Sequence, residues 1–303
     1  MKDMSQQNRT ILAAIAIGIG LFLVLVVPTM VQHSLDSVLD ELLIVVDGVE
    51  AADGVEAVAP QVKFESGFTL FSAWYPIWRA LCFIAGITLL TISPMIREGK
   101  DWTAPVALTA YMMPSIGGMF MFLPYVSWVE GSFPIPIIIS MVGLAGFWAT
   151  LLLKNTDRIQ KLAEFGSLTF IGMLATHNFV IGIGSNRMLM TYKRMHASDE
   201  TGGRILDGIE WSILTMTGNI VWMAMVLLMI AIPLIIMRKE AGWWLALIGG
   251  IATLAIDAPA QLIRTSTLDY LYGSLLAIGL LFFLLYPKFK VLLFETAESD
   301  EQG

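Results

Sequence analysis

The stretch WSILTMTGNIVWMAMVLLMIAIPLIIM, residues 211–237, contains no charged side chain and few polar ones. An α-helix needs about 20 apolar residues to cross a hydrocarbon core about 30 Å thick. Residues 211–237 exceed that length, so this stretch predicts a transmembrane helix. Seven further stretches also predict spans: 11–33, 70–96, 103–127, 133–153, 167–185, 242–263 and 268–287. We therefore expect an all-α fold, a polytopic integral membrane bundle of about eight helices that forms a single membrane domain over residues 1–303.

The composition supports a membrane protein and leaves little material for a second domain. The chain is 56% hydrophobic and 14% charged, whereas soluble domains carry about 25% charged residues. The longest polar segment, 34–69, is acidic and lies between the first two predicted spans. Apolar residues recur in its first part at helical spacing, at Leu35, Val38, Leu39 and Leu42. This pattern predicts an amphipathic helix followed by a solvated acidic loop.

The basic residues predict the orientation of the chain, because cytoplasmic loops are enriched in Lys and Arg. Eleven of the 18 basic residues lie on one side if the eight spans alternate: Lys2, Arg9, Arg97, Lys100, Lys154, Arg158, Lys161, Arg238, Lys239, Lys288 and Lys290. Both termini are therefore expected to be cytoplasmic, with 288–303 as a cytoplasmic tail and 34–69 as an extracytoplasmic segment. The expected location is the plasma (inner) membrane, as a multi-pass protein.

The segment 186–210 argues against this assignment, because it carries four Lys or Arg residues on the predicted outer side. One interpretation is an extracytoplasmic interfacial loop, partly balanced by its acidic residues. The other is that 167–185 is re-entrant and the span count is wrong. The first is favoured because both flanking stretches are long enough to cross the bilayer.

The partners and cofactors expected from the sequence are few. The predicted outer segments hold more carboxylates than basic groups, which makes nucleic-acid binding implausible. The expected partners are the lipid bilayer and other membrane protein subunits. No phosphate-binding, zinc-protease or nucleophile-elbow motif is present, so no cofactor is expected.

Polar side chains within the spans are the best pointers to a site, because they are costly in lipid. The ligand-pocket candidates are His177, Asn178, Asn219, Asp257, Arg264 and Arg79. All lie at mid-depth or in the predicted outer half, whereas an ion-conducting or proton-coupled path needs polar groups through the whole depth. This asymmetry favours a cavity open to the outer side. The alternative is purely structural: His177 and Asn178 form a helix–helix hydrogen-bonding pair, and Asp257 neutralises Arg79 or Arg264.

A second, weaker candidate lies in the loop 186–210. Its thioethers and imidazole are soft ligands suited to Cu(I), and they come from Met188, Met190, Met195 and His196. A basic, apolar interfacial helix accounts for the same residues, so no metal site is assigned.

These observations leave three classes of function. The first expectation is a non-catalytic integral membrane subunit, a scaffold or accessory protein of a larger complex. The alternative is a transporter or binding protein with an outward-facing pocket for a small or lipid-like ligand. A membrane enzyme that uses His177 and Asp257 as acid–base groups ranks below both, as does a copper-handling protein, and the sequence leans against an enzyme.

Overall fold

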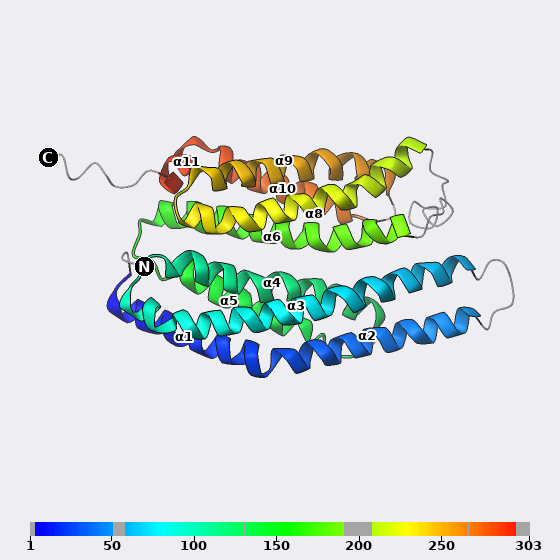
Figure 1. The fold of residues 1–303 in the computed structure, drawn as a ribbon. Coiled ribbons are helices and arrows are strands. Elements are labelled where there is room, and N and C mark those ends of the chain that lie inside the picture. The colour runs from blue at the N-terminus through cyan, green and yellow to red at the C-terminus, as the bar shows by residue number, and fades with distance from the viewer. Residues whose placement is uncertain (1–3, 51–57, 130, 191–207, 266, 295–303) are drawn as a thin grey trace.

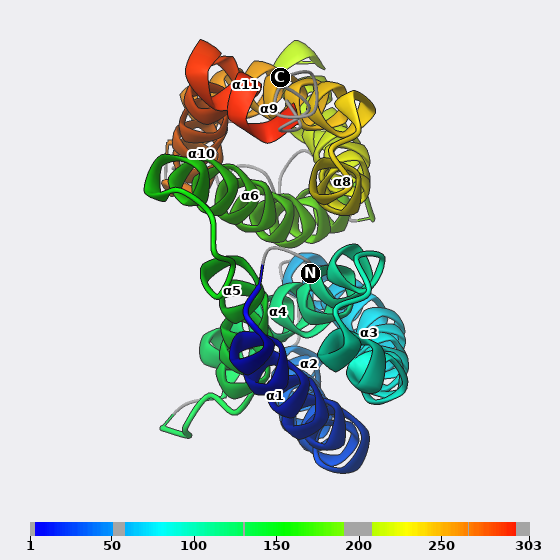
Figure 2. The same ribbon diagram turned by 90° about the vertical axis from the view of Figure 1, so that its left-hand side faces the viewer.

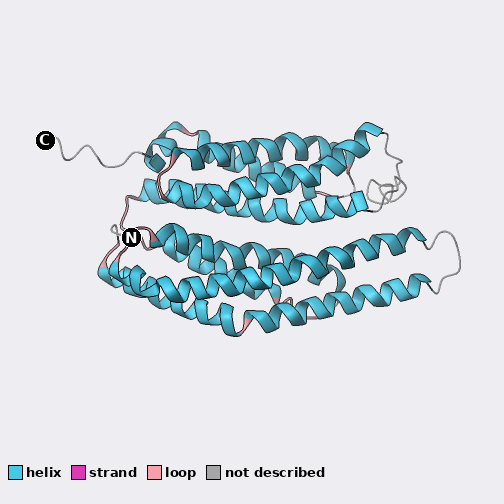
Figure 3. Ribbon diagram, viewed as in Figure 1, coloured by secondary structure: helices cyan, strands magenta, loops and turns pink. Residues whose placement is uncertain are grey.

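The computed structural model describes residues 4–50, 58–129, 131–190, 208–265 and 267–294, with backbone alone for 43–50, 58–68 and 186–190. Within these ranges the chain forms α-helices and short connections, with no strand (Figure 3). The described residues therefore confirm an all-helical membrane bundle.

The helices divide into two groups that lie side by side (Figures 1 and 2). The first group contains α1 (Gln6–Leu25), α2 (Val27–Glu50), α3 (Val58–Glu98), α4 (Thr103–Trp128) and α5 (Pro136–Leu152). The second contains α6 (Arg158–Met190), α8 (Gly208–Ile236), α9 (Glu240–Ile263), α10 (Asp269–Leu285) and α11 (Pro287–Phe294). A short connection between α5 and α6 joins the two groups.

Each group has the same cyclic order of packing. In the first, α3 and α5 both contact α1 and α4; in the second, α8 and α10 both contact α6 and α9. Figure 2 shows the second group end-on as a ring of four helices. Helix α2 continues from α1 in the same direction (Figure 1), whereas α3, α4 and α5, and likewise α6, α8, α9 and α10, alternate in direction as in an up-and-down bundle.

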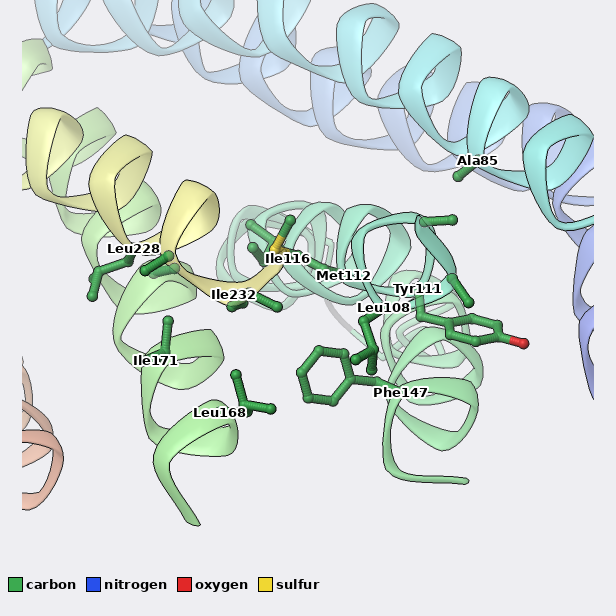
Figure 4. Packing of buried hydrophobic residues seen from close by; sticks show 14 of the residues in the cluster. Ala85, Leu108, Tyr111, Met112, Ile116, Phe147, Leu168, Ile171, Leu228 and Ile232 are labelled. Atoms are coloured by element: carbon green, nitrogen blue, oxygen red, sulfur yellow. The ribbon is translucent and has the colours of Figure 1, made fainter. Parts of the chain in front are cut away.

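The two groups meet through apolar side chains, mainly from α4 against α6 and α8 (Figure 4). Leu108, Met112 and Ile116 of α4 and Ile171 of α6 are each 3% exposed or less. An aromatic cluster centred on Phe179 extends this interface, with ring centroids 4.9–5.3 Å from Phe120, Trp74 and Trp78. Because lipid provides no hydrophobic driving force between helices, this close packing holds the two groups together.

The structure does not confirm eight spans. Six of the described helices are long and apolar enough to cross a membrane, or seven if the bent pair α10–α11 counts as one span. Helix α5, predicted as a span over 133–153, has 17 residues, about 26 Å at 1.5 Å per residue. Helix α10 has the same length. Both are shorter than the hydrocarbon core, which is why the count is lower.

The first predicted span, 11–33, is longer than the helix that the structure shows there. Helix α1 ends at Leu25, and α2 begins at Val27. Pro28 lacks an N–H and fixes its own φ, so it is tolerated in a first helical turn but not in a helix interior. The amphipathic helix expected from residue 34 therefore begins seven residues earlier. Its apolar face is buried, with Leu35, Val38 and Leu42 each 7% exposed or less.

The end of the last predicted span also differs. Helix α10 stops at Leu285, and α11 turns away from it by 70°. Tyr286 precedes Pro287 and takes the extended conformation that this position favours. The predicted tail 288–303 therefore begins as a packed helix, because Phe289 and Leu293 are buried. Residues 295–303 lie outside the described residues.

The expectation for 167–185 can be stated more precisely. Helix α6 runs without a break from Arg158 to Met190, and Arg158–Ser185 passes as a membrane span. Within the described residues, nothing in α6 has the break of a re-entrant loop. Most of 186–210 lies outside the described residues.

The connections that the basic residues predict to be cytoplasmic lie together at one end of the bundle. The start of α1, helix α11 and the turns that join α3 to α4, α5 to α6 and α8 to α9 gather at one end (Figure 1, left). There Asn8 Nδ2 donates to Leu153 O at 2.8 Å, and Arg9 donates to Glu98 O at 3.2 Å. Lys154 Nζ lies 2.6 Å from Glu164 Oε2. The side of the membrane on which this end lies stays a prediction.

Candidate functional site

A cavity of about 770 Å³ lies between the two helix groups. Its walls come mainly from α4, α5, α6 and α10, and apolar side chains make up most of them. The apolar lining comprises Met112, Ile116, Met119, Leu123, Leu144, Phe147, Trp148, Leu168, Met173, Val180, Ile181, Ile232 and Leu276. Polar side chains line the remainder, including Ser115, Ser140, Thr169, Thr176 and His177.

The cavity reaches the lateral face of the bundle. Met173 lies in the middle of α6, lines the cavity and is 48% exposed. Tyr272, near the start of α10, is 56% exposed. Helices α5 and α10, which both line the cavity, lie on the same side of the interface in Figure 2. A ligand in the surrounding bilayer would reach the cavity without passing through an aqueous channel.

Charged groups lie at one end of the cavity, where α9 ends and α10 begins. Arg264 Nη1 lies 3.4 Å from Asp269 Oδ2, and both residues line the cavity. The Arg264 guanidinium carbon is 5.7 Å from the centroid of the Tyr270 ring. Gln261 stabilises the turn between the two helices: its Nε2 donates to Arg264 O at 3.0 Å and to Thr267 O at 2.7 Å.

His177 links the cavity wall to a buried carboxylate. Its side chain is 13% exposed and lines the cavity, while its Nε2 lies 3.7 Å from Oδ2 of the fully buried Asp257. Gly273 of α10 closes over both atoms: a β-carbon there would lie 2.0 Å from Asp257 Oδ2 and 2.5 Å from His177 Nε2. Neither carboxylate oxygen nor His177 Nε2 makes a hydrogen bond within the described residues. Buried polar atoms are almost always hydrogen-bonded, so this pair is unusual.

Two hydrogen bonds hold the surroundings of the pair. Asn178 Nδ2 donates to Thr253 Oγ1 at 2.8 Å, and Thr253 donates in turn to Gly249 O at 2.9 Å. Ser185 Oγ and the Tyr270 hydroxyl lie 3.0 Å apart. These contacts tie α6 to α9 and to α10, which fixes the helices that carry His177 and Asp257.

The structure brings together some of the predicted pocket residues and separates others. His177 and Arg264 line the cavity, Asp257 lies against His177, and Asn178 points to α9. Asn219 does not belong to this group, because it is exposed on α8. Arg79 lies on α3 in the other helix group, where it donates to Gln32 of α2. Asp257 lies against His177, whereas Arg264 lies against Asp269.

The weak copper candidates cannot be placed. Met195 and His196 lie outside the described residues, and only the backbone of Met188 and Met190 is described. Among the described residues, no three His, Cys, Asp or Glu side chains gather closely enough to hold a metal ion.

Sequence reasoning missed four contributors to the site. Asp269 and Tyr272 line the cavity, and both lie in the first residues of the predicted span 268–287. Gly273 forms a small-residue motif with Ala277, which predicts close approach of helices, but it does not reveal that the approaching groups are an imidazole and a carboxylate. Thr253 gave no signal, because a single hydroxyl in a span commonly bonds its own helix.

The arrangement suits ligand binding better than group-transfer chemistry. The apolar walls can bury hydrocarbon, while the Arg264–Asp269 end can contact a polar group. At the charged end, Thr267 Oγ1 donates to Asp269 Oδ2 at 3.0 Å, and Arg264 lies against the same carboxylate oxygen. Comparisons with protein-family models, with characterised proteins and with solved structures find no match to this chain.

Proposed function

We propose that this chain is an integral membrane binding protein that takes up a small amphipathic, lipid-like ligand in the cavity between its two helix groups. The observation that carries the proposal is the cavity itself, about 770 Å³ in volume and open on the lateral face. Ligand pockets usually enclose about 300–1,000 Å³ and are mainly apolar with a few placed polar groups.

The distribution of polarity indicates how such a ligand would lie. Phe147, Trp148 and Leu168 line the part of the cavity toward the connection between α5 and α6, and Arg264 and Asp269 line the opposite end. A hydrocarbon tail would pack against Phe147, Trp148 and Leu168, because an apolar wall offers it surroundings similar to the bilayer interior. The headgroup would lie near the ion pair, whose opposite charges favour a zwitterionic or hydrogen-bonding group.

The expectation of an accessory subunit rests on the sequence alone. It stands as the rival outcome of the experiment below.

Two glycines provide a matched test. A β-carbon at Gly172 on α6 or at Gly18 on α1 meets nothing within 4 Å, so both positions have room for a larger side chain. Gly172 lines the cavity, whereas Gly18 is exposed on the outer face of α1. Gly172→Phe therefore fills the cavity, and Gly18→Phe introduces the same helical substitution elsewhere.

The measurement is mass spectrometry of lipids that remain bound after extraction in mild detergent, followed by titration with a fluorescent lysophospholipid. We expect wild type and Gly18→Phe to retain the same lipids and to bind the probe, and Gly172→Phe to lose both. Equal lipid retention and probe binding in all three proteins would contradict the proposal. Stoichiometric co-purification of another membrane protein, with no difference between the variants, would favour the accessory subunit.

A further inference from the structure

The buried pair His177–Asp257 is not explained by ligand binding, because Asp257 lies behind the cavity wall. The two side chains come from α6 and α9 and meet in the interior of the second helix group. Asp257 is fully buried, and its carboxylate makes no hydrogen bond within the described residues. An ionisable group in a membrane span is expensive and usually pairs with another group.

The charge of the pair depends on the number of protons it holds. With no proton, an ionised Asp257 leaves a net negative charge in the interior. With one proton, the pair is neutral overall, either as imidazolium and carboxylate or as imidazole and carboxylic acid. With two protons, the pair carries a net positive charge. Burying an uncompensated charge is strongly unfavourable, so the one-proton state is the stable one.

Among the described side chains, no other ion pair involves His177 or Asp257. Helices α4 and α5 carry no charged residue, and the only one on α8 is Glu210, in its first turn. On α3, Arg79 donates to Gln32 of α2. On α6 itself, Glu164 is paired with Lys154 near the other end. On α9 and α10, Arg264 is paired with Asp269, and Tyr270 bonds Ser185.

The position of Gly273 adds a geometric reason for a proton in particular. Its α-carbon packs over both His177 Nε2 and Asp257 Oδ2, which closes one side of the pair. The 3.7 Å separation is slightly longer than a hydrogen bond, so a small movement of either side chain would complete one. A coordination shell of several oxygen ligands would need more room.

We propose that His177 and Asp257 together form a binding site for a single proton, exchanged with the cavity through the exposed edge of the imidazole. The proton is shared by the two residues, so its binding belongs to the pair. The site does not form a path across the membrane. It sets the charge of the cavity wall and does not depend on the identity of any ligand.

The first test is the pH dependence of unfolding, measured for the ligand-free chain in mixed detergent micelles. In the unfolded chain, Asp and His release their protons near pH 3.9 and 6.5. Above about pH 6.5 the folded state then holds one proton more than the unfolded state, so stability falls as pH rises. The unfolding equilibrium constant should rise about tenfold per pH unit while the pair keeps its proton.

Variants separate this effect from other titrations. Asp257→Asn should remove the tenfold slope because it removes the carboxyl group that helps to hold the proton, while Asp36→Asn, which changes an exposed carboxylate, should keep it. Parallel curves for wild type and Asp257→Asn between pH 6.5 and 8.5 would overturn the proposal. A midpoint that depends on Na⁺ when choline replaces it, and that Asp257→Asn makes independent of Na⁺, would assign the site to a metal cation and also overturn it.

The second test does not need Asp257→Asn to fold. The chain has three histidines, so His33→Gln with His196→Gln leaves His177 alone. Nitrogen NMR of the labelled imidazole across the same pH range then reports on the pair directly. We expect no transition at the pH where an exposed imidazole titrates. A transition of ordinary midpoint would overturn the proposal.

Discussion

Gly273 of α10 lies so close to Asp257 of α9 that a β-carbon at position 273 would come within 2.0 Å of the carboxylate oxygen Oδ2. The glycine thus determines how closely α10 approaches α9 beside the buried pair. A side chain at position 273 would therefore overlap His177 and Asp257 where they now lie.

This relationship predicts that Gly273→Ala is destabilising. The methyl group must displace Asp257 or His177 or push α10 outward, and overpacking of this kind costs about 1–3 kcal/mol. Equilibrium unfolding in mixed micelles measures the loss. Gly172→Ala, where the β-carbon has open space, is the matched control and should be neutral. Equal stability of the two variants would contradict the geometry.

The Phe179 side chain predicts a second large effect. Its ring contacts Phe120, Trp74 and Trp78 at the interface between the two groups, and it is 1% exposed. Phe179→Ala should cost about 3–5 kcal/mol, since a buried aromatic leaves a cavity that neighbouring rings fill only in part. Phe282→Ala, at a position 61% exposed, should cost much less in the same unfolding assay. Similar losses of unfolding free energy in the two variants would show that the Phe179 cluster contributes no more to stability than an exposed ring.

The ion pair between Lys154 and Glu164 predicts an asymmetry between single and double substitutions. Both side chains are largely buried, at 12% and 10% exposure. Lys154→Ala should cost about 3–5 kcal/mol because it leaves Glu164 buried without its partner. The double variant Lys154→Met with Glu164→Leu should recover most of that loss. Unfolding free energies of the three proteins measure this recovery, and a double variant no more stable than Lys154→Ala would contradict the cost of an unpaired buried charge.

The exposed pair Lys100–Glu98 is the control for that prediction. Its atoms are 3.8 Å apart and its side chains are 56% and 60% exposed. Such pairs contribute about 0–1 kcal/mol, so Lys100→Ala should leave the unfolding midpoint nearly unchanged. A loss as large as that of Lys154→Ala would show that the turn near residue 99, not charge burial, limits stability.

Helix α11 predicts a smaller effect that depends on charge. Lys290 Nζ lies 4.0 Å from the centroid of the Trp243 ring and 3.7 Å from Glu240 Oε1. Lys290→Met keeps the apolar stem and removes the cation, so it should cost about 0.5–1 kcal/mol. Added salt should lower the unfolding free energy of the wild type but leave it above that of Lys290→Met. The reason is that a contact with a ring face is screened less than an exposed ion pair. Identical salt dependence would argue against the ring contact.

The sequence predicts helix positions well and helix ends poorly. Long uncharged runs such as 211–237 can only be helices in lipid, because every backbone group must be bonded within the segment. The ends depend on single residues whose effect is local. Pro28 separates α1 from α2 and Pro287 separates α10 from α11, yet Pro114 and Pro124 lie inside the unbroken α4. Neighbouring helices decide between these outcomes, and no sequence pattern describes them.

The candidate site was predicted in part for a related reason. The position of a residue within a predicted span gives its depth in the membrane, so His177, Asp257 and Arg264 could be assigned to one region. The angle around each helix is not legible when nearly every face is apolar. Asn219 has the right depth but lies on the exposed face of α8, and Arg79 belongs to the other helix group. The repeated packing of the two groups also leaves no trace in the residues.

Two of the helices that line the cavity, α5 and α10, have only 17 residues each. A helix of that length measures about 26 Å, several ångströms less than a typical hydrocarbon core. A bilayer meets a short helix by compressing its acyl chains beside it. The membrane should therefore be thinnest at the mouth of the cavity, where lipid tails are already strained and leave the bilayer at lower cost.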